Sequence, residues 1–287
     1  MSKKWLLLIS LSIIWGSSFI LIKKGLLGLS PLQLGALRII FAGLFIIPIG
    51  LNSVLKMPKL YWKHIVITAL LGTFLPAFLF AIAQTQINSS ISAVLNSLTP
   101  LNTLWVGYVW FGMQFNKNQF IGVIIGFIGS LILVLNAAQI QPTHNYWYAV
   151  FIIIASTCYA LNVNYLKKNL YSIKPLTITA ANFIVMIIPA IIILFYSDYF
   201  LVISQDLVFQ STIFILILGV IGTAIANVLF FKLLQLSSPL FASSVTYLIP
   251  VVALFWGIYF MEKLSLIQFF AVIIILFGVW LSSRKKN

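Results

Sequence analysis

The feature that most constrains this chain is a succession of apolar runs, each long enough to cross a lipid bilayer. A transmembrane helix needs about 17 to 25 predominantly apolar residues. Runs of that length cover residues 5–22, 31–50, 62–83, 90–112, 119–136, 147–166, 176–196, 211–234, 240–261 and 265–282. We therefore expect ten transmembrane segments joined by short connections.

These segments are expected to be helices. Hydrocarbon offers no hydrogen-bond partners, so a spanning backbone must satisfy its own polar groups, and a helix does so within one segment. The alternating pattern of a membrane barrel is absent from the runs. Only 7% of the 287 residues are charged and 62% are hydrophobic, whereas a soluble domain carries about 25% charged residues. The predicted fold class is an all-α integral membrane protein.

The first run could be mistaken for a signal peptide because it follows Lys3 and Lys4. It has no convincing small-residue cleavage site, and it ends on a second lysine pair, Lys23 and Lys24. We expect it to remain as the first helix.

The chain is strongly basic, with a net charge of +14. Its only acidic residues are Asp198, Asp206 and Glu262. Nucleic-acid binding would need a clustered basic face, but the charges here stand in pairs and triplets between apolar runs. We expect no nucleic-acid partner, and we attribute the basic excess to membrane topology, because Lys and Arg collect in short cytoplasmic loops.

The distribution of basic residues predicts the orientation. With a cytoplasmic N-terminus, the inner side carries Lys3, Lys4, Lys56, Lys59, Lys63, Lys117, Lys167, Lys168, Lys174, Lys232, Arg284, Lys285 and Lys286. The outer side carries only Lys23, Lys24 and Lys263, and Arg38 falls inside a predicted helix. This bias, with an even number of segments, predicts a multi-pass protein of the plasma (inner) membrane with both termini in the cytoplasm.

The sequence offers few side chains that could bind a metal or a cofactor. Cys158 is the only cysteine, so no disulfide can form within the chain, and His64 and His144 are the only histidines. The sequence contains no Walker loop, paired carboxylates or plausible catalytic triad. We expect no metal, no cofactor and no ATP hydrolysis.

The two halves of the chain resemble each other. The matched residues are Lys23-Lys24 with Lys167-Lys168 and Pro31 with Pro175 at an offset of 144, Gly72-Thr73 with Gly222-Thr223 and Pro100 with Pro250 at 150, and Gly129 with Gly278 at 149. The repeats would cover residues 1–140 and 145–287. Five helices in each make the second repeat enter the membrane from the opposite side. Inverted repeats of this kind recur in secondary transporters, where the halves exchange conformations around a central site.

Several segments resemble the EamA family of the drug/metabolite transporter superfamily. They are Trp15-Gly16-Ser17-Ser18-Phe19 with Lys23, the Pro31 to Arg38 stretch, Leu98-Thr99-Pro100 with Gly122 and Gly129, and Leu248-Ile249-Pro250 with Met261-Glu262, Gln268 and Gly278. The resemblance spans nearly the whole chain. It implies an inverted five-plus-five repeat and the transport or export of metabolites such as amino acids. One departure is Gln114, which follows Gly112 and Met113 where the first repeat of the family commonly has Gly-Glu.

Polar side chains recur on one face of two equivalent helices. Residues spaced by three lie along one slowly rotating helix face, and the first helix has Ser12, Trp15 and Ser18 in that spacing. At an offset of 144, the sixth helix has Ser156, Tyr159 and Asn162. Such faces are typical of a central cavity, and we assign Trp15, Tyr159 and Asn162 to it. For the serines, cavity lining and close helix packing both stay open.

Two further helices combine polar residues with a matched proline. The fourth carries Asn96, Thr99, Thr103 and Pro100, and the ninth carries Ser243, Thr246, Tyr247 and Pro250. A proline inside a helix frees a carbonyl and can bend the helix. We interpret Pro100 and Pro250 as hinges, and Asn96, Thr99, Thr246 and Tyr247 as substrate contacts.

Arg38 is the only cation well inside a predicted helix, and its repeat mate is Asn182. A central arginine costs about 2.5–3.5 kcal/mol on insertion scales. It could anchor a substrate carboxylate or phosphate through its planar donor fork, or it could be structural. Both interpretations stay open, and both residues are candidate substrate contacts.

No Asp or Glu falls in mid-membrane, and Glu262 sits at a helix end beside Lys263, where capping or pairing is expected. Proton coupling usually employs buried carboxylates or histidines. The sequence therefore favours facilitated transport.

The leading interpretation is a secondary carrier of small metabolites, most simply an exporter, with membrane lipid as its surroundings. Alternatives are a lipid translocator or passive channel and, with less support, a membrane-embedded enzyme using Asp198, Asp206 and His144. The cargo, the direction of transport and the oligomeric state stay open.

Overall fold

The computed structural model describes residues 3–87, 89–137, 146–259 and 266–282. These residues form helices joined by short turns, with no strand among them. The helices up to residue 137 are α1 (Lys3–Gly25), α2 (Pro31–Leu55), η1 (Lys59–Tyr61), α3 (Trp62–Ala69), η2 (Leu70–Phe74), α4 (Leu75–Ala83), α5 (Ser89–Asn96), α6 (Thr99–Phe111) and α7 (Lys117–Ala137). Those after it are η3 (Tyr146–Tyr148), α8 (Ala149–Asn169), α9 (Pro175–Phe195), α10 (Tyr199–Val202), α11 (Asp206–Ile217), η4 (Leu218–Ile225), α12 (Ala226–Leu236), α13 (Pro239–Ser243), α14 (Val245–Tyr259) and α15 (Leu266–Ser282).

Within the described residues the ten apolar runs are mostly helical, and turns interrupt two of them, at Ser97-Leu98 and at Ser244. Six continuous helical stretches are long and apolar enough to cross a membrane: Lys3–Gly25, Pro31–Leu55, Lys59–Ala83, Ala149–Asn169, Pro175–Phe195 and Asp206–Leu236. Shorter apolar helices lie at Lys117–Ile132, Pro239–Val252 and Phe269–Ser282. The prediction of an all-helical chain with several membrane-crossing helices is confirmed for the described residues.

Two of the long stretches contain a π-helical segment, which periodicity did not predict. η2 interrupts Lys59–Ala83 and η4 interrupts Asp206–Leu236. The matched pairs Gly72-Thr73 and Gly222-Thr223 lie within these segments. Inside η4, the hydroxyl of Thr223 donates to the carbonyl oxygen of Leu218 at 3.0 Å. Segments of π-helix are rare and often mark functional sites.

The single helix expected over residues 90–112 is instead divided into α5 and α6, because Pro100 opens α6. A proline has no N–H to bond the carbonyl four residues before it. The carbonyl of Asn96 accepts the Thr99 hydroxyl instead, at 2.7 Å. Pro250 lies inside α14 and likewise leaves the carbonyl of Thr246 free, which accepts the Ser97 hydroxyl at 3.2 Å. Both freed carbonyls are thus satisfied by hydroxyls, one from Thr99 at the start of α6 and one from Ser97 in the turn between α5 and α6.

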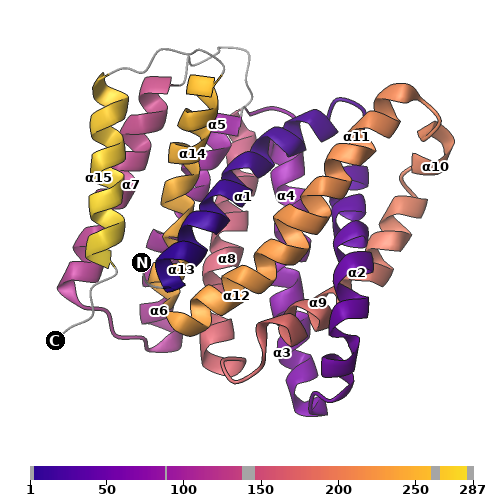
Figure 1. The fold of residues 1–287 in the computed structure, drawn as a ribbon, viewed down its shortest axis with the longest axis horizontal. Coiled ribbons are helices and arrows are strands. Elements are labelled where there is room, and N and C mark those ends of the chain that lie inside the picture. The colour runs from indigo at the N-terminus through magenta and orange to yellow at the C-terminus, as the bar shows by residue number, and fades with distance from the viewer. Residues whose placement is uncertain (1–2, 88, 138–145, 260–265, 283–287) are drawn as a thin grey trace.

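The helices pack in pairs that cross the midpoint of the chain. α2 lies along α9, and α7 lies along α15 at the opposite edge of the molecule (Figure 1). α1 packs against α11, η4, α12 and α14, while α8 packs against α3, η2, α4 and α6. The contacts of α1 with η4, α12 and α14, and of α8 with η2 and α4, join elements that line the central cavity described below.

Small residues let α7 and α15 approach closely. A Cβ atom on Gly278 would lie 2.5 Å from the backbone nitrogen of Gly126 and 2.7 Å from the carbonyl oxygen of Gly122. Helices in lipid associate through such van der Waals contact between small residues, because hydrocarbon gives no hydrophobic drive for pairing. Any larger residue at position 278 would separate the pair.

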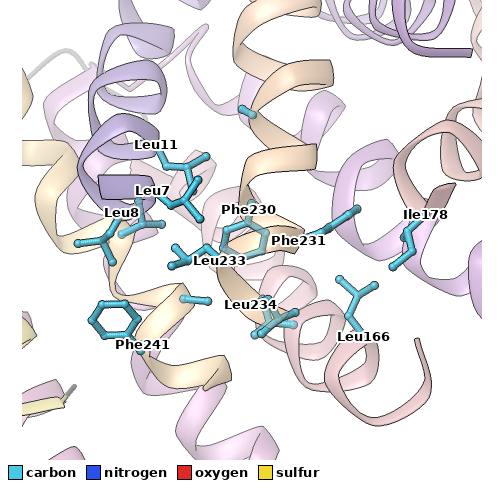
Figure 2. Packing of buried hydrophobic residues seen from close by; sticks show 14 of the residues in the cluster. Leu7, Leu8, Leu11, Leu166, Ile178, Phe230, Phe231, Leu233, Leu234 and Phe241 are labelled. Carbon is cyan, nitrogen blue, oxygen red and sulfur yellow. The ribbon is translucent and has the colours of Figure 1, made fainter. Parts of the chain in front are cut away.

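The largest apolar cluster lies where α1, α8, α9, α12 and α13 meet. Figure 2 shows Leu7, Leu8 and Leu11 of α1 facing Phe230 and Leu233 of α12, with Phe241 of α13 below them. Leu166 of α8 and Ile178 of α9 close the other side. This cluster fixes α12 against α1 and α8, the two helices that carry the predicted polar faces.

Candidate functional site

A cavity of about 90 Å³ lies in the middle of the bundle. Its walls come from both halves of the chain: from α1, α2, η2, α4, α5 and α6 of the first half, and from α8, η4, α12, α13 and α14 of the second. Eight of the ten residues predicted to contact substrate line it: Trp15, Ser18, Arg38, Asn96, Thr99, Tyr159, Asn162 and Thr246.

The polar face of α1 meets the π-helical segment η4. The indole nitrogen of Trp15 donates to the carbonyl oxygen of Gly222 at 3.0 Å. The hydroxyl of Ser18 donates to Ile14 in its own helix at 2.8 Å, and a Cβ atom on Gly222 would lie 2.8 Å from that hydroxyl. Gly222 therefore permits α1 to approach η4, so Ser18 serves close packing as well as lining the cavity.

The polar face of α8 meets the other π-helical segment, η2, in the same way. A Cβ atom on Gly72 would overlap the amide nitrogen of Asn162 and lie 2.8 Å from its Cγ atom. The Asn162 oxygen is buried and has no hydrogen-bond partner. Tyr159, one turn earlier, stacks on Phe80 of α4 with ring centroids 6.1 Å apart. α8 thus contributes to the cavity wall an aromatic ring and an asparagine whose buried amide oxygen is unpaired.

Arg38 on α2 is the only charged residue among the described residues that line the cavity. Its Nε atom donates to the Thr223 hydroxyl of η4 at 2.7 Å. The backbone is close as well, since a Cβ atom on Gly219 would lie 2.9 Å from the Arg38 carbonyl oxygen. The side chain is only partly buried. Because it lines the cavity, its guanidinium can meet a bound molecule.

Asn182 and Tyr247 are not brought to this cavity. Asn182 is 1% exposed, and its amide oxygen accepts the Thr68 hydroxyl at 3.0 Å, between α9 and α3. Tyr247 is fully buried against Gly126, and its hydroxyl donates to the carbonyl oxygen of Val123 on α7 at 2.8 Å. Their polar groups are satisfied by neighbouring helices. Both residues therefore act in packing in this structure.

The structure adds polar residues that sequence reasoning had not placed at the site. The amide of Asn227 on α12 donates to the Thr73 hydroxyl of η2 at 3.1 Å, and both residues line the cavity together with Thr223. Phe80 and Phe230 add apolar wall. The Gly-Thr pairs were visible in the sequence as a repeat, but nothing local indicated that their threonines face inward.

The acidic residues considered for an enzyme lie elsewhere. Asp198 precedes α10 in a left-handed backbone conformation with φ of 56°, and Asp206 begins α11. Neither lines the cavity, and the described residues contain no group of three His, Cys, Asp or Glu side chains able to hold a metal ion. His144 and Glu262 lie outside the described residues.

Comparison with protein families identifies the chain. The model of the EamA-like transporter family matches residues 3–135 and again residues 146–284. The chain belongs to the EamA-like transporter family. The two matches cover nearly all of the sequence, and the helices that meet at the cavity come from both.

Curated relatives agree with the family. The uncharacterized inner membrane transporter YedA of Escherichia coli (strain K12) is 29% identical over 97% of this chain and 90% of its own length. An uncharacterized transporter of Archaeoglobus fulgidus is 26% identical over 99% of this chain and all of its own. The S-adenosylmethionine/S-adenosylhomocysteine transporter of Chlamydia trachomatis serovar L2 is 24% identical over 85% of this chain and 77% of its own.

A protein of known crystal structure has the same fold. It superposes with a TM-score of 0.73 over 98% of both chains at 16% sequence identity. EamA-like family membership and the apolar helices together make this chain a multi-pass membrane transporter, and its relatives are named as transporters and not as enzymes.

Proposed function

We propose that this protein is a secondary transporter whose central cavity binds a small metabolite and opens alternately to the two sides of the membrane. The observation that carries the proposal is the cavity itself, a partly polar site in the middle of an apolar bundle with walls from both family-matched halves. The moving halves would be residues 1–140 and 145–287.

The contacts across the midpoint support an inverted repeat. Ser18 packs on Gly222 and Asn162 packs on Gly72. Ser18 and Asn162 are related by the offset of 144, and the two glycines by the offset of 150. Each half therefore inserts its first helix against the π-helical segment of the other half. Reciprocal contacts of this kind are expected where two similar units face each other about an axis in the membrane plane.

The course of the chain supports ten crossings with both termini on the cytoplasmic side of the plasma membrane. The Lys3 end of α1 and the Ser282 end of α15 lie toward the same side of the bundle, the lower one in Figure 1. The turn between α2 and η1 and the start of α7, which carry Lys56 and Lys117, lie on that side too. This distribution agrees with the positive-inside rule.

Within the cavity, Trp15 and Tyr159 would shield or stack on the substrate. Hydrogen bonds from Ser18, Asn96, Asn162, Thr99 and Thr246 would orient it, and Arg38 would hold an acidic group. Bending would occur at Pro100 and Pro250, where the carbonyls of Asn96 and Thr246 are bonded by hydroxyls instead of by the helix backbone. Such side-chain bonds can re-form with other partners when a helix bends.

Counterflow in proteoliposomes tests the proposal. Vesicles are preloaded with unlabelled metabolites, such as a mixture of amino and organic acids, and uptake of each labelled compound is measured. A carrier shows uptake stimulated by the preloaded compound, whereas a channel shows none, and scrambling of labelled phospholipid would indicate a lipid translocator. The comparison variant is Gly72→Leu, whose side chain would enter the space of the Asn162 amide at the cavity wall. Equal counterflow in both proteins would overturn the proposal.

A further inference from the structure

The cavity carries a positive charge that nothing in its wall balances. Of the described residues that line it, Arg38 alone is charged, and no Asp or Glu is among them. A charge removed from bulk water is costly unless it is paired and hydrogen-bonded. The walls around it are mostly apolar, with Phe19, Phe80 and Phe230 among the lining residues, so the unbalanced charge acts in a medium of low polarity.

The donor capacity of Arg38 is also mostly unused. A guanidinium has five N–H donors in a planar fork. Among the described residues, its one hydrogen bond runs from Nε to the Thr223 hydroxyl at 2.7 Å. That bond fixes the orientation of the group and leaves the four N–H donors of the two terminal nitrogens. Two parallel bonds from such a fork match the two oxygens of a carboxylate.

A second unmet group lies in the same wall. The Asn162 side chain is 3% exposed, and its oxygen has no hydrogen-bond partner. Buried acceptors of this kind are uncommon, and leaving one unpaired destabilises the protein. Its own helix does not satisfy it, and the neighbouring Gly72 offers no side chain. A donor on a molecule in the cavity would satisfy it.

We propose that the cargo is a small monocarboxylic acid of net charge −1, with a neutral hydrogen-bond donor and an apolar or aromatic body. Its carboxylate binds the terminal nitrogens of Arg38, its hydroxyl or amide N–H donates to the Asn162 oxygen, and its body packs between Trp15, Phe80 and Tyr159. The inference rests on the proposed transport function and narrows the cargo of the same cavity.

The net charge of the cargo distinguishes a monocarboxylate from a cation, a zwitterion or a phosphate dianion. A cation would meet Arg38 with no counter-charge in the wall. A zwitterion would neutralise Arg38 but would bring an ammonium group for which the cavity has no carboxylate. A phosphate dianion would leave one negative charge unbalanced. A single carboxylate brings the sum of charges in the cavity to zero, which is the cheapest state to carry through an occluded, low-dielectric site.

Four compounds with one benzyl body test the charge and the donor separately. They are 3-phenyllactate, an anion with a hydroxyl, 3-phenylpropionate, an anion without one, phenylalanine, a zwitterion, and phenylalaninamide, a cation. Binding to the purified protein in lipid nanodiscs is measured by titration calorimetry. We expect phenyllactate to bind about threefold to tenfold more tightly than phenylpropionate, because one neutral hydrogen bond is added. Phenylalanine should bind more weakly than either anion, and phenylalaninamide weakest of all.

Two variants assign the effects to their residues. Arg38→Gln should weaken both anions by about tenfold or more, as expected for a lost charge-assisted contact, and should not weaken phenylalaninamide. Asn162→Ala should reduce phenyllactate to the affinity of phenylpropionate and leave phenylpropionate unchanged. The matched control is Asn102→Ala, which removes an amide bonded to Ser156 between α6 and α8 and not at the cavity wall. It should keep the order of the four compounds.

The wild-type order alone is decisive if a variant does not fold. The inference is overturned if no anion of the series binds, if phenylalanine or phenylalaninamide binds as tightly as phenyllactate, or if Arg38→Gln weakens all four equally. Counterflow measurements distinguish a failure of this cargo assignment from a failure of the proposed transport function. Exchange of a zwitterion or cation in proteoliposomes would leave a transporter with another cargo. Selective binding of phenyllactate without any counterflow would leave an anion site in a protein that does not carry it.

Discussion

The wall built by α1 and the wall built by α8 are alike in shape and different in chemistry. In each, a polar side chain of the helix rests on the glycine of a π-helical segment, Ser18 on Gly222 and Asn162 on Gly72. The serine is satisfied by its own helix at 2.8 Å, whereas the amide oxygen of the asparagine is not satisfied at all. The two walls share the glycine that lets two backbones approach closely. They differ in the polar side chain that packs on that glycine.

The helices that flank these walls show the same divergence. Arg38 and Asn182 are repeat mates on α2 and α9, which pack along each other. Arg38 reaches the cavity and Thr223, while Asn182 is bonded to Thr68 and faces α3. Under the proposed function, a scaffold with one charged wall would offer a cargo a single orientation. The repeat would then supply the motion, and the residues at which the halves differ would supply the selectivity.

The largest expected effect separates the two mates on α2 and α9. Arg38→Gln should lower kcat/KM for an organic anion by about tenfold to a hundredfold, as expected when a bond to a charged group is lost, with little change in melting temperature. Asn182→Leu should lower the melting temperature and leave kcat/KM nearly unchanged, because it leaves the Thr68 hydroxyl without its side-chain acceptor. Counterflow kinetics and thermal unfolding in detergent measure both. Equal losses of transport in the two variants would break the comparison.

The next largest effect we expect is a difference in stability between alanine substitutions at the two glycines of the π-helical segments. A Cβ atom at Gly72 meets the amide of Asn162, whereas at Gly222 it meets the Ser18 hydroxyl and the movable end of Leu218. Overpacking costs about 1–3 kcal/mol, and we expect Gly72→Ala near the upper end and Gly222→Ala near the lower. Melting temperatures of the two variants at one detergent concentration test the order. A larger drop for Gly222→Ala would show that α1 is the tighter contact.

The two aromatic residues should separate stability from transport. Trp15→Phe removes the indole bond to the Gly222 carbonyl and should cost about 1 kcal/mol of stability. The Tyr159 hydroxyl has no hydrogen bond to any described residue, so Tyr159→Phe should leave the melting temperature unchanged. Any effect of Tyr159→Phe would then appear in the KM for cargo. A fall in melting temperature for Tyr159→Phe would reveal a structural partner of its hydroxyl.

The smallest expected effect is that of pH. No His, Asp or Glu is among the described residues lining the cavity, and side chains that titrate near neutrality are chiefly histidines and perturbed carboxylates. At a fixed cargo gradient, the counterflow rate should stay constant between about pH 6 and about pH 8, where carboxylic acids remain ionised. Discharging the proton gradient should not change it either. If transport stopped when the proton gradient was discharged, the protein would couple transport to protons through a group outside the two walls, since neither wall contains an acid.

Much of the site followed from spacing alone. Residues three apart share a helix face, so Trp15 with Ser18 and Tyr159 with Asn162 could be expected at one wall each, and the structure brings all four to the cavity. Their role in binding stays a prediction. Other features had no local signal. The apolar pattern of residues 62–83 is the same whether or not a π-turn interrupts it, and the direction of Tyr247 depends on the space left by Gly126 on a distant helix.

The sequence by itself determined that the chain is helical and crosses a membrane, because hydrocarbon admits few backbone conformations. It also predicted a repeat, from glycines, prolines and lysines that match in the same order in both halves. Only the tertiary structure decided which polar groups meet. Arg38 and Thr223 are 185 residues apart, yet their atoms lie within 2.7 Å. Whether a polar side chain faces lipid, a neighbour or the cavity depends on the packing of all the helices around it. That packing leaves the terminal nitrogens of Arg38 without a hydrogen bond to any described residue and the Asn162 oxygen unpaired, which are the two groups that we propose a cargo satisfies.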